Sequence, residues 1–420
     1  MQNYEDLHID AHLLPLFDFS LNTFARNKIK NILHHPLASK EKILTRQKIL
    51  RAFMSNYDVL QNYSYTVLYL NEVHEFLINE TIEDYSHQKL RYRFFVPKHL
   101  KFRLKGKLSQ LILLFFRLHS YYFSRISITD FPEDYQKKIR SINSFFSYFN
   151  MSYYEQVVRE GGLKDKHIID LSRRLHKAKN ECDIQSFFDD FFDFESYLSI
   201  SLGIKKHNFT FPEIVEEGLS IEKFYHPSLT QPIKNNFQTR KNVIVLNGPN
   251  MSGKSTLLKA ISICVYLGNL GIAIPSEQAR IPIFDYFSFA LNKKDDLLGG
   301  YSHFMKEIQT VKEVIIAANK SKKCFAVFDE MFSATNPNDA AKISIKTVNG
   351  LTKFKRSLFF VSTHLQEIKS ELNQTVGSFY MDCDIQNSTP SFTFKMREGW
   401  SSIQIGQKIF QQEGLEDLLE

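Results

Sequence analysis

The chain has 420 residues, of which 43% are hydrophobic and 24% charged, and its formal net charge is +7 at pH 7. This length predicts two or three domains, and the composition is ordinary for a soluble globular protein. The mild positive charge permits a nucleic-acid or anionic-surface partner without requiring one. The four cysteines form no Cys-x-x-Cys pair, which argues against a disulfide scaffold or a zinc site and suits a reducing compartment: Cys182, Cys264, Cys324 and Cys383.

The first ten residues lack a basic segment followed by an apolar one, so we expect no signal peptide. No apolar stretch approaches the roughly 18 residues of a membrane span. We therefore expect a cytoplasmic protein without a membrane partner.

Residues 1 to about 85 are predicted to be helical. Apolar residues recur at spacings of three and four before a break at His35-Pro36, and the same spacing resumes from Ile43 to Phe53.

Residues 85–129 contain no Asp or Glu and ten Lys or Arg, with aromatic residues between them. Such a stretch can follow a phosphate backbone. The alternative is the solvated face of a helical arm with its aromatic side chains in the core. Under the first reading, the DNA-binding candidates are Lys89, Arg91, Arg93, Lys98, Lys101, Arg103, Lys105 and Lys107.

Residues 135–205 again have an amphipathic helical pattern. We expect the carboxylates of Asp189, Asp190, Asp193 and Glu195 to lie on the solvated face of a helix whose Phe residues are buried, rather than to form a metal site. Turn residues then mark a domain boundary near residue 215. We expect a helical domain over 1–215 and an α/β nucleotide-binding domain over 216–420, because short apolar runs alternate with helices there.

The stretch Lys241–Thr256 contains Gly-x-x-x-x-Gly-Lys-Ser between an apolar strand and a helix. This is a P-loop, in which glycines let backbone N–H groups converge on phosphates and the following helix adds the positive end of its dipole. Lys254 is expected to contact the β- and γ-phosphates, and Ser255 to ligate Mg²⁺. The predicted ATP-binding residues here are Gly248, Pro249, Asn250, Met251, Ser252, Gly253, Lys254, Ser255 and Thr256.

Three later segments complete a hydrolytic site. Two glycines before Ser302 open a helix, and its free N–H groups and hydroxyl can complete the site of a second subunit; the alternative is a plain helix cap. The apolar strand Cys324–Phe328 ends in Asp329, a predicted Mg²⁺ ligand, and Glu330, which would orient and deprotonate the attacking water. A second strand ends at His364, which can donate a hydrogen bond to the γ-phosphate.

These motifs resemble those of the MutS family of DNA mismatch repair proteins, within the ABC-type ATPases. GPNMSGKST resembles the family's P-loop, and DDLLGGYSHFMKEI its signature segment. VFDEMFSATNPNDA resembles its acidic motif, and STHLQEI its histidine motif. Tyr225-His226-Pro227 resembles the opening of its ATPase domain, so His226 joins the predicted ATP-binding residues. The helical core and the C-terminal segment are similar more weakly.

The chain also departs from the family pattern. His303 stands where the family has Thr, and Phe332 and Ala334 replace glycines after the acidic pair. These changes affect the expected contact between subunits. The chain starts at the helical core, so we expect a short member that lacks the amino-terminal mismatch-reading and connector domains.

The resemblance implies an all-helical core and lever domain followed by an ABC-type P-loop ATPase domain. It implies an ATPase that uses ATP and Mg²⁺, is modulated by DNA, and works as a homodimer on mismatched, branched or distorted DNA, nucleoid-associated and with possible repair-type protein partners. Two alternatives stay open: an ABC-type ATPase that acts on a protein partner without DNA, and a weakly hydrolysing, nucleotide-gated scaffold.

Overall fold

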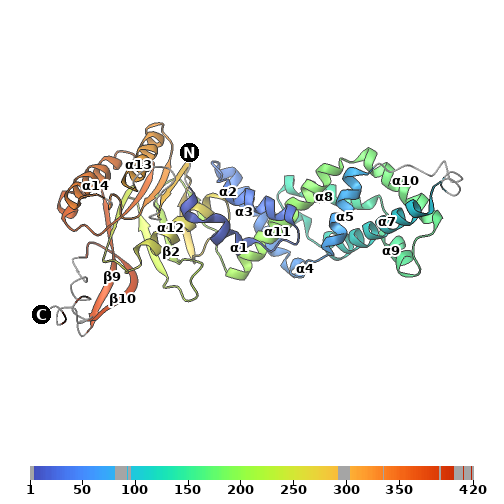
Figure 1. The fold of residues 1–420 in the computed structure, drawn as a ribbon, viewed down its shortest axis with the longest axis horizontal. Helices are drawn as coiled ribbons and strands as arrows, with labels where there is room; N and C mark the ends of the chain where they lie inside the picture. Colours follow the sequence, from blue (N-terminus) through green and yellow to red (C-terminus); the bar gives the residue numbers. More distant parts are fainter. Residues whose placement is uncertain are drawn as a thin grey trace. The chain divides into compact units, whose positions relative to one another are not determined.

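The computed structural model describes residues 4–80, 92, 96–291, 303–333, 335–386, 389–401, 410 and 418. The chain forms two compact units, each built from more than one stretch of sequence (Figure 1). The helical unit comprises Phe17–Asn31 and Lys48–Lys206. The sheet unit comprises Met1–Leu16, Ile32–Gln47 and His207–Glu420.

The helical unit contains α-helices joined by short turns. Its helices are α4 (Tyr57–Leu60), α5 (Val67–Asn79), α7 (Lys98–Leu118), α8 (Glu133–Ser147), α9 (Met151–Arg159), α10 (Asp165–Glu181) and α11 (Ile184–His207), together with parts of α2 (Thr23–His34) and α3 (Lys40–Ser55). Short 3-10 or π turns lie at η3 (His119–Phe123) and η4 (Ile128–Asp130). The helical prediction for these regions is confirmed.

Aromatic side chains dominate the core of the helical unit. Phe187, Phe191 and Phe194 of α11 are all at most 4% exposed. Phe145 of α8 packs on Phe187 with ring centroids 4.2 Å apart, one of many tilted or edge-to-face pairs there. Such contacts add about 0.5–1.5 kcal/mol per pair beyond simple burial. The high Phe content of the chain therefore has a structural use in this unit.

The prediction for the acidic tract is wrong at Glu195, which is 1% exposed. This residue lies four positions after Phe191 and one turn before Ser199, so the 3.6-residue period puts it on the buried stripe of α11. Asp189 is 61% exposed and pairs with Lys28, as expected of a solvated carboxylate. The presence of a charge did not distinguish the buried Glu195 from the exposed Asp189, because other helices pack around most of the circumference of α11.

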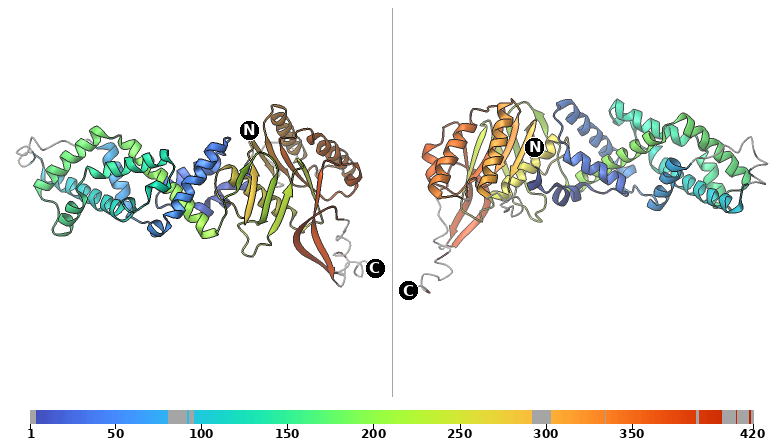
Figure 2. Two further views of the ribbon diagram at one scale, coloured as in Figure 1. Left: turned by 180° about the vertical axis from the view of Figure 1, so that it is seen from behind. Right: turned by 45° about the horizontal axis from the view of Figure 1, so that its top comes forward.

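The sheet unit combines two sheets with flanking helices (Figure 2). Its strands are β1 (Glu213–Val215), β2 (Leu219–Phe224), β3 (Asn235–Thr239), β4 (Val243–Asn247), β5 (Gln278–Pro282), β6 (Tyr286–Ala290), β7 (Cys324–Phe328), β8 (Leu358–Thr363), β9 (Gly377–Gln386) and β10 (Thr389–Glu398). Its helices are α1 (Leu14–Phe17), α12 (Lys254–Asn269), α13 (His303–Asn319) and α14 (Pro337–Leu351), with short turns at η1 (Glu5–Leu7), η2 (Ile9–Leu13) and η5 (Glu367–Glu371).

The larger sheet has the order β10-β9-β4-β8-β7-β6, and the smaller has the order β1-β5-β2-β3. Strands β9, β4, β8, β7 and β6 are parallel, while β10 returns antiparallel to β9. Every residue of β4, β7 and β8 is buried. Continuous apolar strands of this kind are typical of a parallel sheet covered on both faces.

Alternate residues of these strands face different helices. Val245, Phe328 and Val361 pack in one core with α13 and α14. On the other face, the ring of Tyr266 from α12 meets Phe287 of β6 edge to face. Because the strands are parallel, the segments that follow their carboxyl ends meet at one edge of the sheet. The expected helical region followed by a sheet domain is confirmed.

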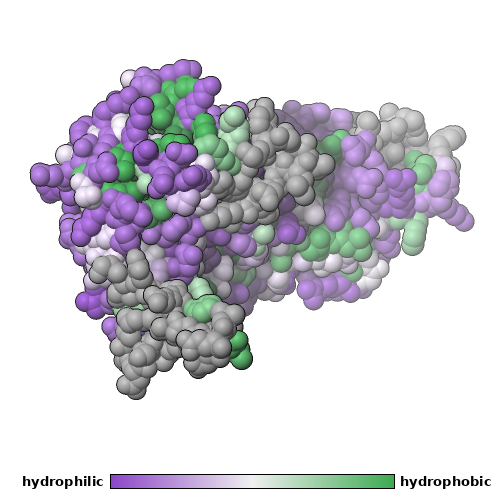
Figure 3. All heavy atoms as spheres, turned by 60° about the vertical axis from the view of Figure 1, so that its left-hand side comes forward, coloured by the Kyte–Doolittle hydropathy of each residue, from purple (hydrophilic) through white to green (hydrophobic). Residues whose placement is uncertain are grey.

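The surface of the sheet unit in Figure 3 is largely hydrophilic, and hydrophobic residues form separate small groups on it. In the described part of the chain, no helix is both long and apolar enough to cross a membrane. The domain boundary near residue 215 stays a prediction, because the division into two compact units does not show which segments fold independently.

Candidate nucleotide-binding site

The P-loop lies between β4 and α12, as the motif predicted. Gly248, Met251 and Gly253 have φ angles of 141°, 68° and 91°. A Cβ at Gly253 would also stand 3.1 Å from the ring of Phe394, so glycine is needed there for both conformation and space. The loop therefore reaches α12 through backbone conformations that few side chains tolerate.

Lys254 begins α12 and is only 5% exposed. Its ammonium group donates hydrogen bonds to the carbonyl oxygens of Gly248 and Pro249, both at 2.8 Å. The lysine thus folds back over the loop, where an incoming phosphate would compete for its protons. Ser255 and Thr256 follow in the first turn, and both are exposed. The N–H groups of that turn and the helix dipole favour an anion at this position.

The acidic pair lies at the same edge of the sheet. Strand β8 lies between β4 and β7, so the P-loop strand and the acidic strand are one strand apart. Asp329 and Glu330 follow β7 and are half-buried, and His364 follows β8 and is exposed. The fold therefore brings Lys254, Asp329, Glu330 and His364 to one edge, from segments far apart in the sequence.

Ser362 of β8 joins the two carboxylate residues and was not singled out from the sequence. Its hydroxyl donates to Asp329 Oδ1 and accepts a hydrogen bond from the backbone N–H of Glu330 at 2.8 Å. Glu330 itself has a φ of 49°, which is uncommon for a residue other than glycine. Ser362 therefore fixes the position of both residues. Its place directly before Thr363-His364 was the signal that could have identified it.

A cavity of about 300 Å³ opens beside the P-loop. It brings His226 and Tyr225 together with Gly253 and Thr256. Phe394, which has a φ of 53° at the bulge in the β9–β10 hairpin, also lines it. A concave site with aromatic and apolar walls next to a phosphate-binding loop suits a nucleotide base. Nothing in the local sequence around Phe394 pointed to this role.

The imidazole of His226 is suited to a neutral role in this cavity. Burial lowers its pKa, and the nearby positive groups His12 and Lys259 lower it further. Its Nδ1 accepts a hydrogen bond from the backbone N–H of Ser228 at 3.3 Å, which requires an unprotonated Nδ1. The ring can therefore stack on a base or donate from Nε2 at neutral pH.

The residues present fit a nucleotide with Mg²⁺. Asp329 is partly exposed and has one carboxylate oxygen bonded to Ser362, and the hydroxyl of Ser255 is accessible at the start of α12. Oxygen ligands of this kind suit Mg²⁺. Inside the loop, the buried hydroxyl of Ser252 has no hydrogen-bond partner among the described residues. Ser302, predicted to serve a second subunit, lies outside the described residues.

The predicted DNA contacts occupy the first turns of α7. Lys98, Lys101, Arg103, Lys105 and Lys107 lie on this helix, while Lys89, Arg91 and Arg93 lie outside the described residues. Phe102, between two of these cations, is 80% exposed. This surface combines cations with an accessible aromatic ring.

Part of that positive charge serves the helical unit itself. Arg103 Nη2 lies 2.7 Å from Glu80 Oε1, and Lys107 contacts the same oxygen. Burial raises the pKa of Glu80, but the two cations together hold it below its usual value. Lys101 lies over the ring of Tyr92, 4.9 Å from its centroid. Lys98 and Lys105 have no ion pair within the described residues.

This chain matches one known protein-family model over part of its length, and it is similar to individual known proteins. Residues 244–417 match the family model of MutS domain V. The chain is 26% identical over 340 residues to the DNA mismatch repair protein MutS of Pelotomaculum thermopropionicum, covering 74% of this chain and 38% of that protein. It is 23% identical over 309 residues to the MutS of Thermotoga maritima, covering 70% and 38%. The matching part of the chain thus spans less than two-fifths of these relatives.

Proposed function

Because this chain is a MutS relative, similar to domain V of that family over residues 244–417, we propose that it is an ATP-dependent DNA-binding protein. The observation that carries the proposal is the edge where the P-loop, Asp329-Glu330 and His364 follow neighbouring parallel strands. This order of loop, acidic strand and histidine strand belongs to an ABC-type ATPase rather than to a kinase or a small GTPase.

The residues of this edge have distinct roles in hydrolysis. Lys254 leaves the carbonyls of its own loop and binds the β- and γ-phosphates, together with the N–H groups at the start of α12. Ser255 and Asp329 would hold Mg²⁺, which would neutralise negative charge on the phosphates. Glu330 orients the attacking water and accepts its proton, and His364 donates to the γ-phosphate. Ser362 holds the carboxylate of Asp329 and the backbone N–H of Glu330 in position.

The cavity beside the loop receives the base. His226 is kept neutral by burial, so it adds no positive charge and can stack or donate from Nε2. The wall of Phe394 and neighbouring apolar side chains excludes water from this end of the nucleotide. The base therefore contributes binding energy without contact to the reacting phosphate.

We propose a homodimer with two composite sites. Each site uses Lys254, Ser255, Asp329, Glu330 and His364 of one protomer together with Ser302 of the partner subunit. ATP draws the two sheet units together, and hydrolysis releases them. The helical unit transmits this change as a lever to DNA that is mismatched, branched or distorted.

DNA contact by the helical unit is supported by α7. Lys98 and Lys105 carry no ion pair within the described residues, and Phe102 is 80% exposed between the cations. Cations bind backbone phosphates, and an exposed ring can stack on an unpaired base. Such contacts recognise the shape of the DNA and its unpaired bases rather than its base sequence.

A binding panel tests this function. Fluorescence anisotropy of the full chain is measured with a duplex, a mismatched duplex, a four-way junction and a single strand of equal length. Each is measured with ATP, ADP or no nucleotide at 50 and 200 mM salt. We expect tighter binding to a distorted or branched form, changed by nucleotide and weakened at high salt. Absence of binding to every DNA at 50 mM salt contradicts DNA binding and favours a protein partner.

One observation favours the weakly hydrolysing scaffold as a second candidate. Phe332, which replaces a glycine of the family pattern, has a φ of 63° and is 2% exposed. Its ring packs on Phe304 in the first turn of α13, with centroids 6.1 Å apart. This contact holds the loop after the acidic pair against α13, whose first turns belong to the signature-like segment. A loop held in this way moves less between nucleotide states.

The Glu330→Gln variant separates the two candidates. An active ATPase loses its water-orienting base, so steady-state phosphate release falls at least 100-fold while ATP binding persists. A scaffold already hydrolyses so slowly that the variant leaves the rate unchanged. The exposed Glu75→Gln variant is the control, since Glu75 lies on α5 in the helical unit, outside the motifs assigned to the site.

A further inference from the structure

The amino-terminal edge of the larger sheet carries a row of basic loops. Segments 240–241 (Arg-Lys) and 353–356 (Lys-Phe-Lys-Arg) end one residue before β4 and β8, and segment 320–323 (Lys-Ser-Lys-Lys) directly precedes β7. These three strands are consecutive neighbours in the sheet, so the loops lie side by side. We call their eight cations the basic row: Arg240, Lys241, Lys320, Lys322, Lys323, Lys353, Lys355 and Arg356.

The basic row is separate from the nucleotide site. The P-loop and the acidic pair follow the carboxyl ends of the same parallel strands, so the two sites occupy opposite edges of the sheet. A five-residue strand is about 16 Å long at the usual rise per residue. None of the residues assigned to ATP belongs to the basic row.

Only some of the eight cations of the basic row interact with neighbouring groups of the sheet unit. Lys323 Nζ lies 3.8 Å from Glu216, and Lys241 Nζ donates to the backbone carbonyls of Gln374 and Val376. The carboxyl ends of α13 and α14 each supply about half a negative charge to nearby cations. Within the part of the chain that the structure describes, the side chains of Arg240, Lys355 and Arg356 make no ion pair or hydrogen bond. All three are exposed.

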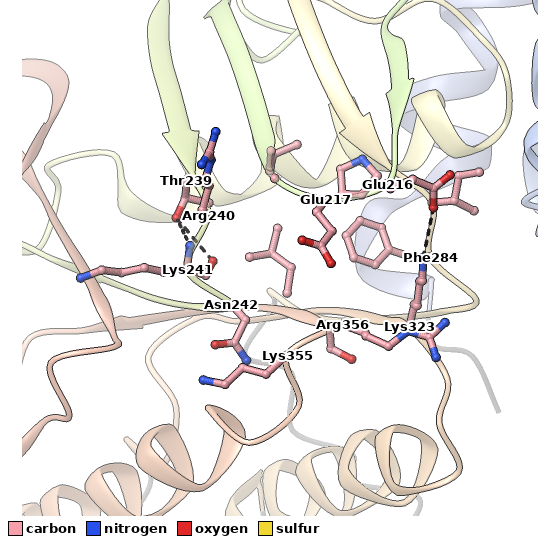
Figure 4. A pocket seen from close by; sticks show the side chains of 16 residues that line it. Glu216, Glu217, Thr239, Arg240, Lys241, Asn242, Phe284, Lys323, Lys355 and Arg356 are labelled. Atoms are coloured by element: carbon pink, nitrogen blue, oxygen red, sulfur yellow. Dashed lines mark hydrogen bonds and ion pairs between the residues drawn. The ribbon is translucent and has the colours of Figure 1, made fainter.

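A cavity of about 190 Å³ lies along the row. Figure 4 shows the labelled cationic side chains around its mouth, with Arg240, Lys355 and Arg356 pointing in different directions. They do not meet at one point, which disfavours a single small anion. Glu216 and Glu217 lie on the same side of the cavity as Arg240, across from Lys355 and Arg356, and they limit the positive charge on that side. The arrangement suits an extended chain of negative charges that passes over the loops.

The cavity offers little accessible apolar surface to a peptide. Leu219, Phe284 and Leu358 in its lining are 1%, 3% and 6% exposed, Pro282 is also buried, and Ile283 is the one half-buried apolar side chain among the lining residues. Peptide partners usually gain their affinity from buried apolar side chains or from an added strand, and exposed ion pairs alone contribute little. A phosphate backbone needs only distributed cations, because binding is driven by release of its counterions.

We propose that the basic row is a second nucleic-acid contact, which binds the phosphate backbone of a strand at the amino edge of the sheet. The inference rests on the proposed DNA-binding function and extends it from the helical unit to the sheet unit. Its contacts are sequence-independent and sensitive to salt.

The test compares two triple variants of the full chain. In one, Arg240→Glu, Lys355→Glu and Arg356→Glu reverse the cations without a local partner. In the matched control, Lys312→Glu, Lys342→Glu and Lys346→Glu make the same change in net charge at exposed positions on α13 and α14. Anisotropy of a fluorescein-labelled 30-nucleotide strand and a 30-base-pair duplex is followed from 50 to 200 mM salt. Labelled poly-glutamate serves as a peptide probe, and circular dichroism verifies folding.

We expect the basic-row variant to bind nucleic acid at least tenfold more weakly at 50 mM salt. Its log–log salt slope should be lower by about 2 to 3. The control variant should lose less than threefold. Equal losses in both variants overturn the proposal, as does loss of poly-glutamate binding with nucleic-acid binding intact. If the unmodified chain binds no nucleic acid, the proposed DNA-binding function fails as well, which distinguishes the two failures.

Discussion

The two units use buried polar groups in opposite ways. In the sheet unit, polar side chains lie where strands end, so Asp329 and Glu330 are held by Ser362 yet remain partly exposed to a ligand. In the helical unit, Glu195 is 1% exposed in the middle of a helix and is fully engaged by other residues. The edge of a parallel sheet is open to ligands, whereas a carboxylate inside a bundle can only hold helices together. Substitutions in the first unit should thus affect activity, and in the second stability.

The contacts of Glu195 show what it holds. Its Oε1 accepts from the backbone N–H of Leu21 at 2.7 Å, and its Oε2 accepts from Asn22 Nδ2 at 2.9 Å and Tyr65 OH at 2.7 Å. The two ends of the unit's sequence thereby meet at one carboxylate. Burial raises its pKa to about 7, although the hydrogen bonds from Tyr65, Leu21 and Asn22 oppose that shift.

The largest expected effect is on catalysis by Lys254. Lys254→Ala removes the ammonium group that binds the phosphates, and steady-state ATP hydrolysis should fall about 10³-fold, or roughly 4 kcal/mol. The melting temperature should stay within about 2 °C of the unmodified chain, because only loop contacts are lost. The exposed Lys342→Ala on α14 is the control and should retain full activity. Unfolding of the Lys254 variant would contradict the expectation that substitutions at the edge of the sheet affect activity rather than stability.

Next in size is the effect of Glu195→Ala on stability. Loss of the carboxylate leaves the donors of Leu21, Asn22 and Tyr65 without an acceptor, which should lower the free energy of unfolding by about 3 kcal/mol. Urea unfolding followed by far-UV circular dichroism measures it. Asp189→Ala, on the same helix but 61% exposed, should cost less than about 0.5 kcal/mol. Similar decreases in the free energy of unfolding for both variants would show that the buried hydrogen bonds of Glu195 add no stability beyond that of an exposed ion pair.

The pH dependence of stability gives a third, smaller effect. The folded pKa of Glu195 is raised from 4.5 to about 7, so its contribution is fully present below pH 4.5 and is lost as the pH rises through 7. Between pH 5 and 7 the free energy of unfolding should fall by about 2 kcal/mol relative to Glu195→Gln, which cannot titrate. Urea titrations of both proteins at pH 5, 6, 7 and 8 measure this difference. A constant difference across that range would contradict the assigned shift.

The smallest expected effect concerns Ser362. Ser362→Ala removes the hydroxyl that positions Asp329 and Glu330, so kcat for ATP should fall about tenfold, or roughly 1.4 kcal/mol, with little change in KM. Ser357→Ala is a matched control at the other end of β8, where the hydroxyl accepts from the backbone N–H of Cys324 at 2.9 Å. The control should affect stability but not kcat. Equal changes in kcat would mean that Ser362 serves only to join the strands.

The local elements of the candidate nucleotide site could be predicted from short stretches of sequence. The apolar runs before Gly248 and Asp329 form β4 and β7, and the helix after Lys254 forms as predicted, because strand and helix patterns are short-range properties of the chain. The order of these motifs also indicated the family, which the match of residues 244–417 agrees with. The positions of the motif residues at the strand and helix ends could therefore be predicted, while their roles in ATP binding and hydrolysis stay predictions.

Local patterns did not indicate which residues from distant parts of the chain join these elements in the fold. Phe394 reaches the cavity beside the P-loop from the β9–β10 hairpin. Ser362 of β8 links the carboxylate of Asp329 to the backbone N–H of Glu330, and Glu195 is buried against residues near the start of the chain. The basic row likewise consists of three short loops that are separate in sequence and adjacent only because β4, β8 and β7 are neighbours. Strand order and helix packing depend on the burial of whole faces, which no local pattern records.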